Sequence, residues 1–103
     1  MINLIREYQL QIAGICQSLK IQRLEVFGSA ATGCFDPSRS DIDFIVEFNQ
    51  PDAPPGLLSR YLLLAEQLEG LLGKKVDIIT PNSIRNPYFR ESIESSRQSV
   101  YAA

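Results

Sequence analysis

The sequence contains no histidine, and this absence removes several kinds of catalytic site. Ser-His and Cys-His nucleophile systems use an imidazole as the base, so acid or base chemistry in this chain falls to carboxylates. Only two cysteines are present, Cys16 and Cys34, and their spacing is not that of a CxxC pair. Neither a zinc site nor a disulfide framework is therefore expected.

Long apolar runs and an excess of basic charge are missing as well. The longest uninterrupted apolar stretch covers residues 61–65, whereas a helix that spans a bilayer needs roughly 20 residues. We expect no membrane association, and the first residues do not resemble a secretory signal, which predicts a cytoplasmic location. Ten Lys and Arg stand against 12 Asp and Glu, so direct nucleic-acid binding through a broad basic surface is not expected.

The 103 residues predict a single domain, 1–103, with an ordinary globular composition of 45% hydrophobic and 21% charged residues. Such a chain is long enough for a hydrophobic core but too short for a separate substrate domain. Whatever the protein acts on must therefore come from another molecule.

The spacing of apolar residues predicts alternating helices and strands. Helices are expected over about 2–19, 58–72 and 87–98, and strands over about 24–27, 41–48 and 74–80. A further helix is expected to begin at the turn after residue 27, which gives the order α-β-α-β-α-β-α. This order predicts an α/β (α+β) fold with a small mixed β-sheet and flanking helices.

Three aspartates lie in the predicted strands. Asp41 and Asp43 open one strand, and alternation places their side chains on one face about 6 to 7 Å apart. Asp77 lies in the next strand and would join the pair if the two strands are neighbours in one sheet. Two like charges at this spacing raise each other's pKa unless a cation lies between them. Hard oxygen ligands select magnesium, manganese or calcium, and magnesium usually takes one or two carboxylates together with water and phosphates. A lone aspartate at a strand end is usually a turn or cap residue, but three together favour a site for two metal ions.

The turn at Gly28 and Ser29 precedes the paired aspartates by a short loop. Glycine lets another group approach the backbone closely, and the N–H groups at a helix start favour phosphate oxygens. A Gly-Ser pair alone is a weak signal, and Ser29 is equally compatible with a plain helix cap. Combined with metal-binding carboxylates, the turn predicts nucleotidyl transfer from a nucleoside triphosphate, with the third carboxylate accepting the proton of the attacking hydroxyl.

These motifs resemble the minimal nucleotidyltransferase family of the polymerase β superfamily. The matching stretches are FGS at 27–29, SDIDFIV at 40–46 and VDIIT at 76–80, with Gly33 between the first two. The tail, at 81–84 and 93–101, resembles the ending of the stand-alone MNT or MntA-type antitoxins. The resemblance covers nearly the whole chain and implies the minimal nucleotidyltransferase fold and a magnesium-dependent enzyme that uses ATP. It also implies a HEPN-domain toxin as partner, neutralised by transfer of AMP to one of its tyrosines.

The resemblance also implies roles for individual residues. Gly28 and Ser29 match the phosphate-binding turn, Asp41 and Asp43 match the metal-binding pair, and Asp77 matches the third carboxylate. All three aspartates are thus expected to be both catalytic and metal-binding.

One departure concerns the arginines that members of the family often carry just after the Gly-Ser pair. Ala30 and Thr32 occupy those positions here. The sequence leaves open whether the nucleotide is bound more weakly or whether Arg39, Lys74 or Lys75 supplies the missing charge.

Two other functions remain open from the sequence. A non-catalytic module of the same fold could silence its partner by occlusion, and the acceptor could be a small molecule or a nucleic-acid end. The aromatic residues predict little about the base, because they are expected to pack in the core or between helices rather than to stack on a nucleotide. They are Tyr61, Tyr88, Phe89 and Tyr101.

Overall fold

The computed structural model describes residues 1–33, 36 and 41–103, and its centre is a four-stranded sheet in the order β3-β2-β1-β4. The two central strands pair antiparallel, β4 pairs antiparallel with β1, and β3 pairs parallel with β2. The strands are β1 (Ile21–Phe27), β2 (Ile42–Phe48), β3 (Val76–Ile79) and β4 (Gln98–Ala102). The predicted mixed sheet is confirmed.

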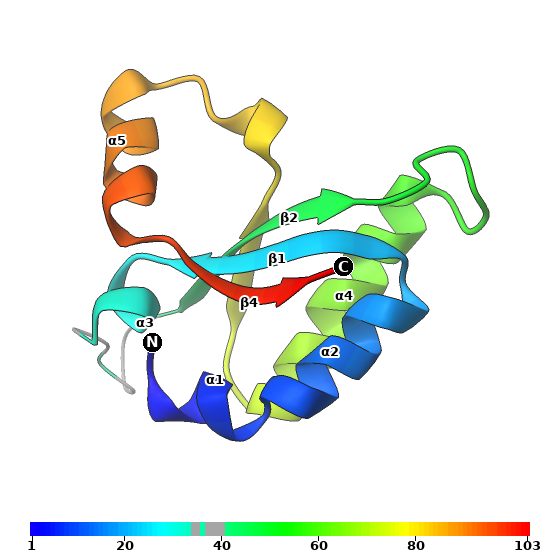
Figure 1. Cartoon of the computed structure of the whole chain (residues 1–103), viewed down its shortest axis with the longest axis horizontal. Helices are drawn as coiled ribbons and strands as arrows, with labels where there is room; N and C mark the ends of the chain where they lie inside the picture. Colours follow the sequence, from blue (N-terminus) through cyan, green and yellow to red (C-terminus); the bar gives the residue numbers. More distant parts are fainter. Residues whose placement is uncertain (34–35, 37–40) are drawn as a thin grey trace.

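Helices connect the strands and cover the sheet from both sides (Figure 1). The longest, α4, ends where predicted, because Gly73 adopts the left-handed conformation (φ 66°) that ends many helices. The helical segments are α1 (Asn3–Glu7), α2 (Gln9–Ser18), α3 (Ser29–Thr32), α4 (Leu57–Leu72), the 3₁₀ turn η1 (Pro81–Ser83) and α5 (Pro87–Ser96). Among the described residues, no helix is both long and apolar enough to cross a bilayer.

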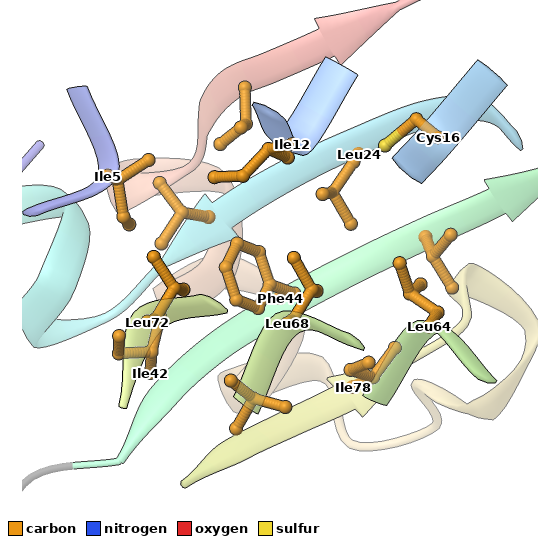
Figure 2. Packing of buried hydrophobic residues seen from close by; sticks show 14 of the residues in the cluster. Ile5, Ile12, Cys16, Leu24, Ile42, Phe44, Leu64, Leu68, Leu72 and Ile78 are labelled. Carbon is orange, nitrogen blue, oxygen red and sulfur yellow. The ribbon is translucent and has the colours of Figure 1, made fainter. Parts of the chain in front are cut away.

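The larger hydrophobic cluster fills the space between the sheet and helices α1, α2 and α4. Figure 2 shows its side chains meeting around Phe44 of β2, with Leu68 of α4 close by. Alternation along β2 explains this arrangement, because Ile42, Phe44 and Val46 all point to this face and are fully buried.

The opposite face of the sheet is covered by much less structure. A cluster of four buried residues, Phe27, Ile45, Ile84 and Ile93, joins the sheet to η1 and α5. Figure 1 shows α5 on the other side of the sheet from α2 and α4. Since Ile93 is the only residue of α5 that is buried, part of this face is left uncovered.

Two expectations about the elements were wrong. The first helix is not continuous over 2–19 but is divided at Tyr8, whose backbone (φ −103°, ψ 16°) ends α1 and begins α2. The last helix stops at Ser96, and residues 98–102 form a fourth strand that sequence analysis missed. This strand pairs with β1, whose backbone groups would otherwise form an open edge.

The loop at 49–55, which follows β2, is organised by a residue that sequence analysis did not single out. Arg60 of α4 is fully buried and has no carboxylate partner among the described residues. Its guanidinium donates to the carbonyl oxygens of Asn49 (2.8 Å), Gln50 (2.9 Å) and Pro55 (3.0 Å). The ring of Phe48 lies 5.5 Å away. A buried cation thus satisfies the acceptors of a turn.

Candidate active site

Parallel pairing of β2 with β3 places Asp43 directly opposite Asp77. Both side chains leave the sheet on the face opposite the larger core, since their neighbours Ile42, Phe44 and Ile78 point into that core. Asp43 is half-buried and Asp77 is exposed. The two strands are therefore neighbours, which meets the condition for these carboxylates to converge.

Asp41 immediately precedes β2 and is half-buried. Its place is fixed by the next residue, because the N–H of Ile42 donates to the carbonyl oxygen of Lys75 (3.1 Å). The starts of β2 and β3 are thereby held together, so Asp41 lies at the same end of the sheet as the pair formed by Asp43 and Asp77.

The electrostatics of the site are set by burial and by repulsion among its carboxylates. Burial above all, and then the negative charges of Asp77 and Asp41, together raise the pKa of Asp43 to about 6. The three aspartates therefore repel one another, which is the cost expected of carboxylates arranged to share a cation.

The carboxylates fit a magnesium ion whose coordination shell is completed by water and by the substrate. Among residues 1–33, 36 and 41–103, no three acidic, histidine or cysteine side chains converge into a ready-made metal cage. Magnesium is rarely held by such a cage and usually takes one or two carboxylates together with waters and phosphate oxygens. Asp43 and its neighbours offer the hard oxygen donors that this ion requires, and the raised pKa of Asp43 is what a cation would relieve.

The backbone at Gly28 lies close to the side chain of Asp43. A Cβ atom at this position would lie 3.0 Å from Oδ2 of Asp43, which is tighter than nine in ten such contacts, so the carboxylate would have to shift. Its backbone (φ 71°, ψ −148°) lies in a region that is essentially reserved for glycine. Only glycine can therefore turn the chain at this point, and the turn lies against a carboxylate of the site.

The short helix α3 starts at Ser29, with Gly28 as its N-cap. Ser29 is therefore the first helical residue and not the cap that sequence analysis had allowed. The N–H groups of Ala31 and Thr32 both donate to the carbonyl oxygen of Gly28 (3.1 Å each). The N–H groups of Ser29 and Ala30 have no acceptor within the helix and are available to other oxygens.

The absence of an arginine is expected to affect nucleotide binding less at position 30 than at position 32. Ala30 is 1% exposed and packs in the larger core, so its side chain does not face the turn where phosphates are expected. Thr32 is exposed, and an arginine there could have reached a ligand. Lys75 is exposed near Asp41, Lys74 is half-buried, and Arg39 lies outside the described residues.

A cavity of about 360 Å³ opens beside the carboxylates at the β3 edge of the sheet. Besides Asp43 and Asp77, residues from the end of β1, from α4, from β3 and from the first turn of α5 line this cavity. These residues are Phe27, Tyr61, Ala65, Val76, Ile78, Ile79 and Phe89. The acids thus form one wall of a largely apolar pocket.

The expectation that the four aromatic residues pack in the core or between helices was wrong for Tyr88, and Phe89 meets it only through its contact with Phe27. Tyr61 and Tyr101 are half-buried against the core, and the hydroxyl of Tyr61 donates to the carbonyl oxygen of Ile78 (2.8 Å). Tyr88 is 82% exposed and Phe89 is 43% exposed. They lie in the first turn of α5, where the sheet offers too little apolar surface to cover them.

The family follows from the whole sequence, because the profile of the nucleotidyltransferase domain matches residues 10–100. The chain belongs to the nucleotidyltransferase domain family. Asp41, Asp43, Asp77 and the Gly28 turn all lie within the matched region, and so do both strands that bring Asp43 and Asp77 together.

Relatives of this nucleotidyltransferase carry compatible names. One protein of Methanocaldococcus jannaschii, provisionally named a protein adenylyltransferase, is 48% identical over 75 residues, which are 73% of this chain and 72% of the relative. A solved structure described provisionally as a minimal nucleotidyltransferase is 30% identical, covers 90% of this chain and 89% of its own, and has a TM-score of 0.72.

Two solved complexes show the same fold at lower identity. One is a toxin-antitoxin complex with AMP-PNP, of which a chain is 21% identical with a TM-score of 0.67 and covers 92% of this chain and 73% of its own. The other is a tri-AMPylated HEPN toxin of Shewanella oneidensis in complex with an MNT antitoxin, at 18% identity and a TM-score of 0.62. Its matched chain covers 96% of this nucleotidyltransferase and 73% of its own length.

Proposed function

We propose that this nucleotidyltransferase transfers AMP from ATP to a tyrosine hydroxyl of a HEPN-type toxin and thereby acts as an antitoxin. The observation that carries the proposal is the pairing of Asp43 with Asp77 beneath the Gly28 turn. Carboxylates on two adjacent strands next to a phosphate-binding turn are the parts that metal-assisted attack on a phosphorus requires.

Each residue has a role in this proposal. Asp41 and Asp43 bind the cation that accompanies the triphosphate, and Asp77 binds a second one. Bound magnesium supplies Lewis-acid stabilisation of the charge that develops on the phosphate oxygens. The N–H groups and hydroxyl at the start of α3, on Ser29 above all, bind the phosphate tail where Gly28 lets it approach.

The proton and the leaving group can be followed through the reaction. The tyrosine oxygen forms a bond to the α phosphorus while the bond from that phosphorus to the bridging oxygen of the β phosphate breaks. Pyrophosphate leaves with the electron pair. Asp77, the more exposed carboxylate of the opposing pair, accepts the hydroxyl proton and releases it to water.

The acceptor is expected to be another protein. Residues 1–103 act as one catalytic domain, and a partner supplies the acceptor. The complex of an MNT antitoxin with a tri-AMPylated HEPN toxin, together with relatives named for protein adenylylation, supports a HEPN toxin as that partner. Because ATP and such a toxin are intracellular, the proposal places the protein in the cytoplasm.

Calorimetric titration of ATP, with and without Mg²⁺, tests the nucleotide site. We expect binding that requires the metal, that is lost in Asp43→Asn and that is retained in Asp52→Asn, a control that removes an exposed carboxylate in the 49–55 loop. If the wild type binds no ATP at millimolar concentration with Mg²⁺, the enzymatic proposal fails and occlusion of the partner becomes the better explanation.

Transfer is tested with ATP labelled on the α phosphate and a purified HEPN toxin. We expect label on a toxin tyrosine with the wild type, none with Asp77→Asn, and a full signal with Asp52→Asn. Neutralisation of the toxin without any label would support the non-catalytic module, whereas labelling of an aminoglycoside or a nucleic-acid end in place of the toxin would assign a different acceptor.

A further inference from the structure

The first turn of α5 holds an aromatic ring in the wall of the cavity that contains the carboxylates. Phe89 lines this cavity together with Asp43 and Asp77, and 43% of the residue is exposed. The ring of Phe89 contacts the ring of Phe27, with the ring centroids 6.1 Å apart and the ring planes at 75°. The T-shaped contact uses part of the ring and leaves the rest open to the cavity.

The position of this ring is fixed by both ends of its helix. At the start, Oδ1 of Asn86 accepts hydrogen bonds from the N–H groups of Tyr88 (2.9 Å) and Phe89 (3.5 Å). Beyond the last turn, Arg97 forms ion pairs with Glu25 of β1 and with Glu94. Phe89 is therefore held over the cavity and does not belong to a frayed end.

The cavity has the dimensions and lining of a small-molecule site. Its volume of about 360 Å³ lies within the range of roughly 300 to 1,000 Å³ that is common for ligand pockets. Most of the lining is apolar, and the polar groups are concentrated on the side of Asp43 and Asp77. This lining suits a ligand that is apolar at one end and carries a cation at the other, as a nucleotide with bound metal does.

We propose that Phe89, with Phe27 and Ile79, binds the nucleobase of the nucleotide. This inference rests on the proposed function, which supplies the triphosphate end of the same ligand at Asp43 and the Gly28 turn. The base lies against the open part of the Phe89 ring, and Phe27 supports that ring from behind. Phe89 is thus a binding residue for the base and takes no part in the chemical step.

The lining also predicts how the base is selected. Of the described residues in the wall, only Asp43, Asp77 and Tyr61 have polar side chains, and the carboxylates are occupied by the phosphate end. The Tyr61 hydroxyl donates to the carbonyl oxygen of Ile78 (2.8 Å). The side chains of the wall therefore act on the face of the base rather than on its edge, which favours purines over pyrimidines and separates adenine from guanine weakly.

Titration of Phe89→Ala with two ligands tests the inference. ATP carries the base, whereas inorganic tripolyphosphate carries only the charge, and both are titrated with Mg²⁺. We expect the variant to lose about fivefold to about a hundredfold in affinity for ATP, the range found when a stacking ring is removed, and to bind tripolyphosphate as the wild type does. Tyr88→Ala, which removes the exposed neighbouring ring from outside the cavity, is expected to change neither affinity.

Two further variants separate stacking from packing. Phe89→Leu keeps an apolar contact on Phe27 without an aromatic face, so it is expected to melt close to the wild type and still bind ATP weakly. Phe89→Tyr is expected to retain ATP affinity. Equal loss of ATP and tripolyphosphate in Phe89→Ala, or unchanged ATP affinity, would overturn the base-binding role while leaving the proposed function standing.

Titration of the wild type shows whether the base-binding inference fails alone or together with the proposed function. If it binds tripolyphosphate and ATP equally well, a phosphate site exists but no base is seated, and this inference fails alone. If it binds neither ligand, the proposed function fails and the inference fails with it. The expected order for wild-type protein is ATP and GTP within a few-fold of each other, and both tighter than CTP.

Discussion

The main-chain N–H of Gly28 donates a hydrogen bond to the side-chain oxygen of Ser96 (3.0 Å), which links the Gly28 turn to the last turn of α5. The hydroxyl of Ser96 in turn donates to the carbonyl oxygen of Ser92 (3.1 Å) within the helix. The two residues are 68 positions apart in the sequence. The orientation of the turn therefore depends on where α5 is anchored.

The first prediction follows from this hydrogen bond. Ser96→Ala leaves a partly buried N–H without its acceptor, so we expect a loss of about 0.5 to 1.5 kcal/mol in the free energy of unfolding. Affinity for tripolyphosphate is expected to fall several-fold because Gly28 is held less firmly, and Ser96→Thr should restore it. Ser95→Ala is the control, since that exposed hydroxyl bonds only to the carbonyl oxygen of Ser92. Equal affinities in the two alanine variants would show that Ser96 acts on stability alone.

The second prediction concerns the space between Gly28 and Asp43. Gly28→Ala places a methyl group 3.0 Å from Oδ2 of Asp43 and forces alanine into a glycine-only backbone conformation. We expect a destabilisation of about 1 to 3 kcal/mol and loss of metal-dependent ATP binding. Gly14→Ala, in the open interior of α2, should instead raise the stability by about 0.5 to 1 kcal/mol. Chemical unfolding and ATP titration measure both effects, and a Gly28→Ala variant that binds ATP normally would contradict the proposed approach of ligand to backbone.

The third prediction concerns the pH dependence of the metal-free protein. The pKa of Asp43 is raised from 3.8 to about 6 in the folded state, so between these values the folded protein holds a proton that the unfolded chain has released. Stability therefore falls as the pH rises through this window and is lowest above it. The Asp43→Asn variant has no carboxylate to ionise at this position, so it does not lose stability in this way. After allowance for solvent screening, we expect the variant to be about 1 to 2 kcal/mol more stable to unfolding than the wild type at pH 7.

Urea unfolding of the two proteins without metal, at pH values from 4 to 7, measures this difference. The gap should open with rising pH and should close when Mg²⁺ is added, because the cation stabilises only the wild type. Asp52→Asn provides the matched comparison, and its stability should track that of the wild type. A gap that is constant across the pH range would mean that Asp43 is not the group responsible.

The fourth prediction concerns Arg60. Arg60→Ala removes the donors for the carbonyl oxygens of Asn49, Gln50 and Pro55 and truncates a fully buried side chain, so we expect a loss of about 2 to 4 kcal/mol in the free energy of unfolding, the range common for truncating a large buried side chain. Arg60→Lys should recover only part of it, because one ammonium cannot reach all three oxygens. The loop lies away from Asp43, so ATP affinity of the folded fraction should not change, and a parallel loss of binding would show that this loop contributes to the site.

The parts of the site that could be predicted are those that depend on local pattern. Alternation around Asp43 predicted which side chains face the core, and the glycine at position 28 predicted a turn before the structure was known. The pairing of Asp43 with Asp77 was a conditional expectation, which depended on whether the two strands are neighbours. That condition is met because the crossover through α4 returns the chain parallel to β2.

What could not be predicted depends on contacts between distant segments. The strand at 98–102 is short and half polar, and only its pairing with β1 distinguishes it from a helix end. Ser96 gives no signal in the sequence, since its role comes from the place where α5 stops. The exposure of Phe89 likewise depends on how little of the sheet α5 covers, and an aromatic residue three positions into a helix looks the same whether it is buried or open.

The parallel register of β2 and β3 also determines which changes of chain length the protein can tolerate. Residues added to the loop at 49–55 would lengthen the crossover but leave Asp43 opposite Asp77, because the position of each carboxylate is set within its own strand. A single residue inserted inside either strand would turn one carboxylate to the other face of the sheet. Length variation among homologues, and the sites suitable for inserting a tag or reporter, should therefore be concentrated in the crossover and excluded from 42–48 and 76–79.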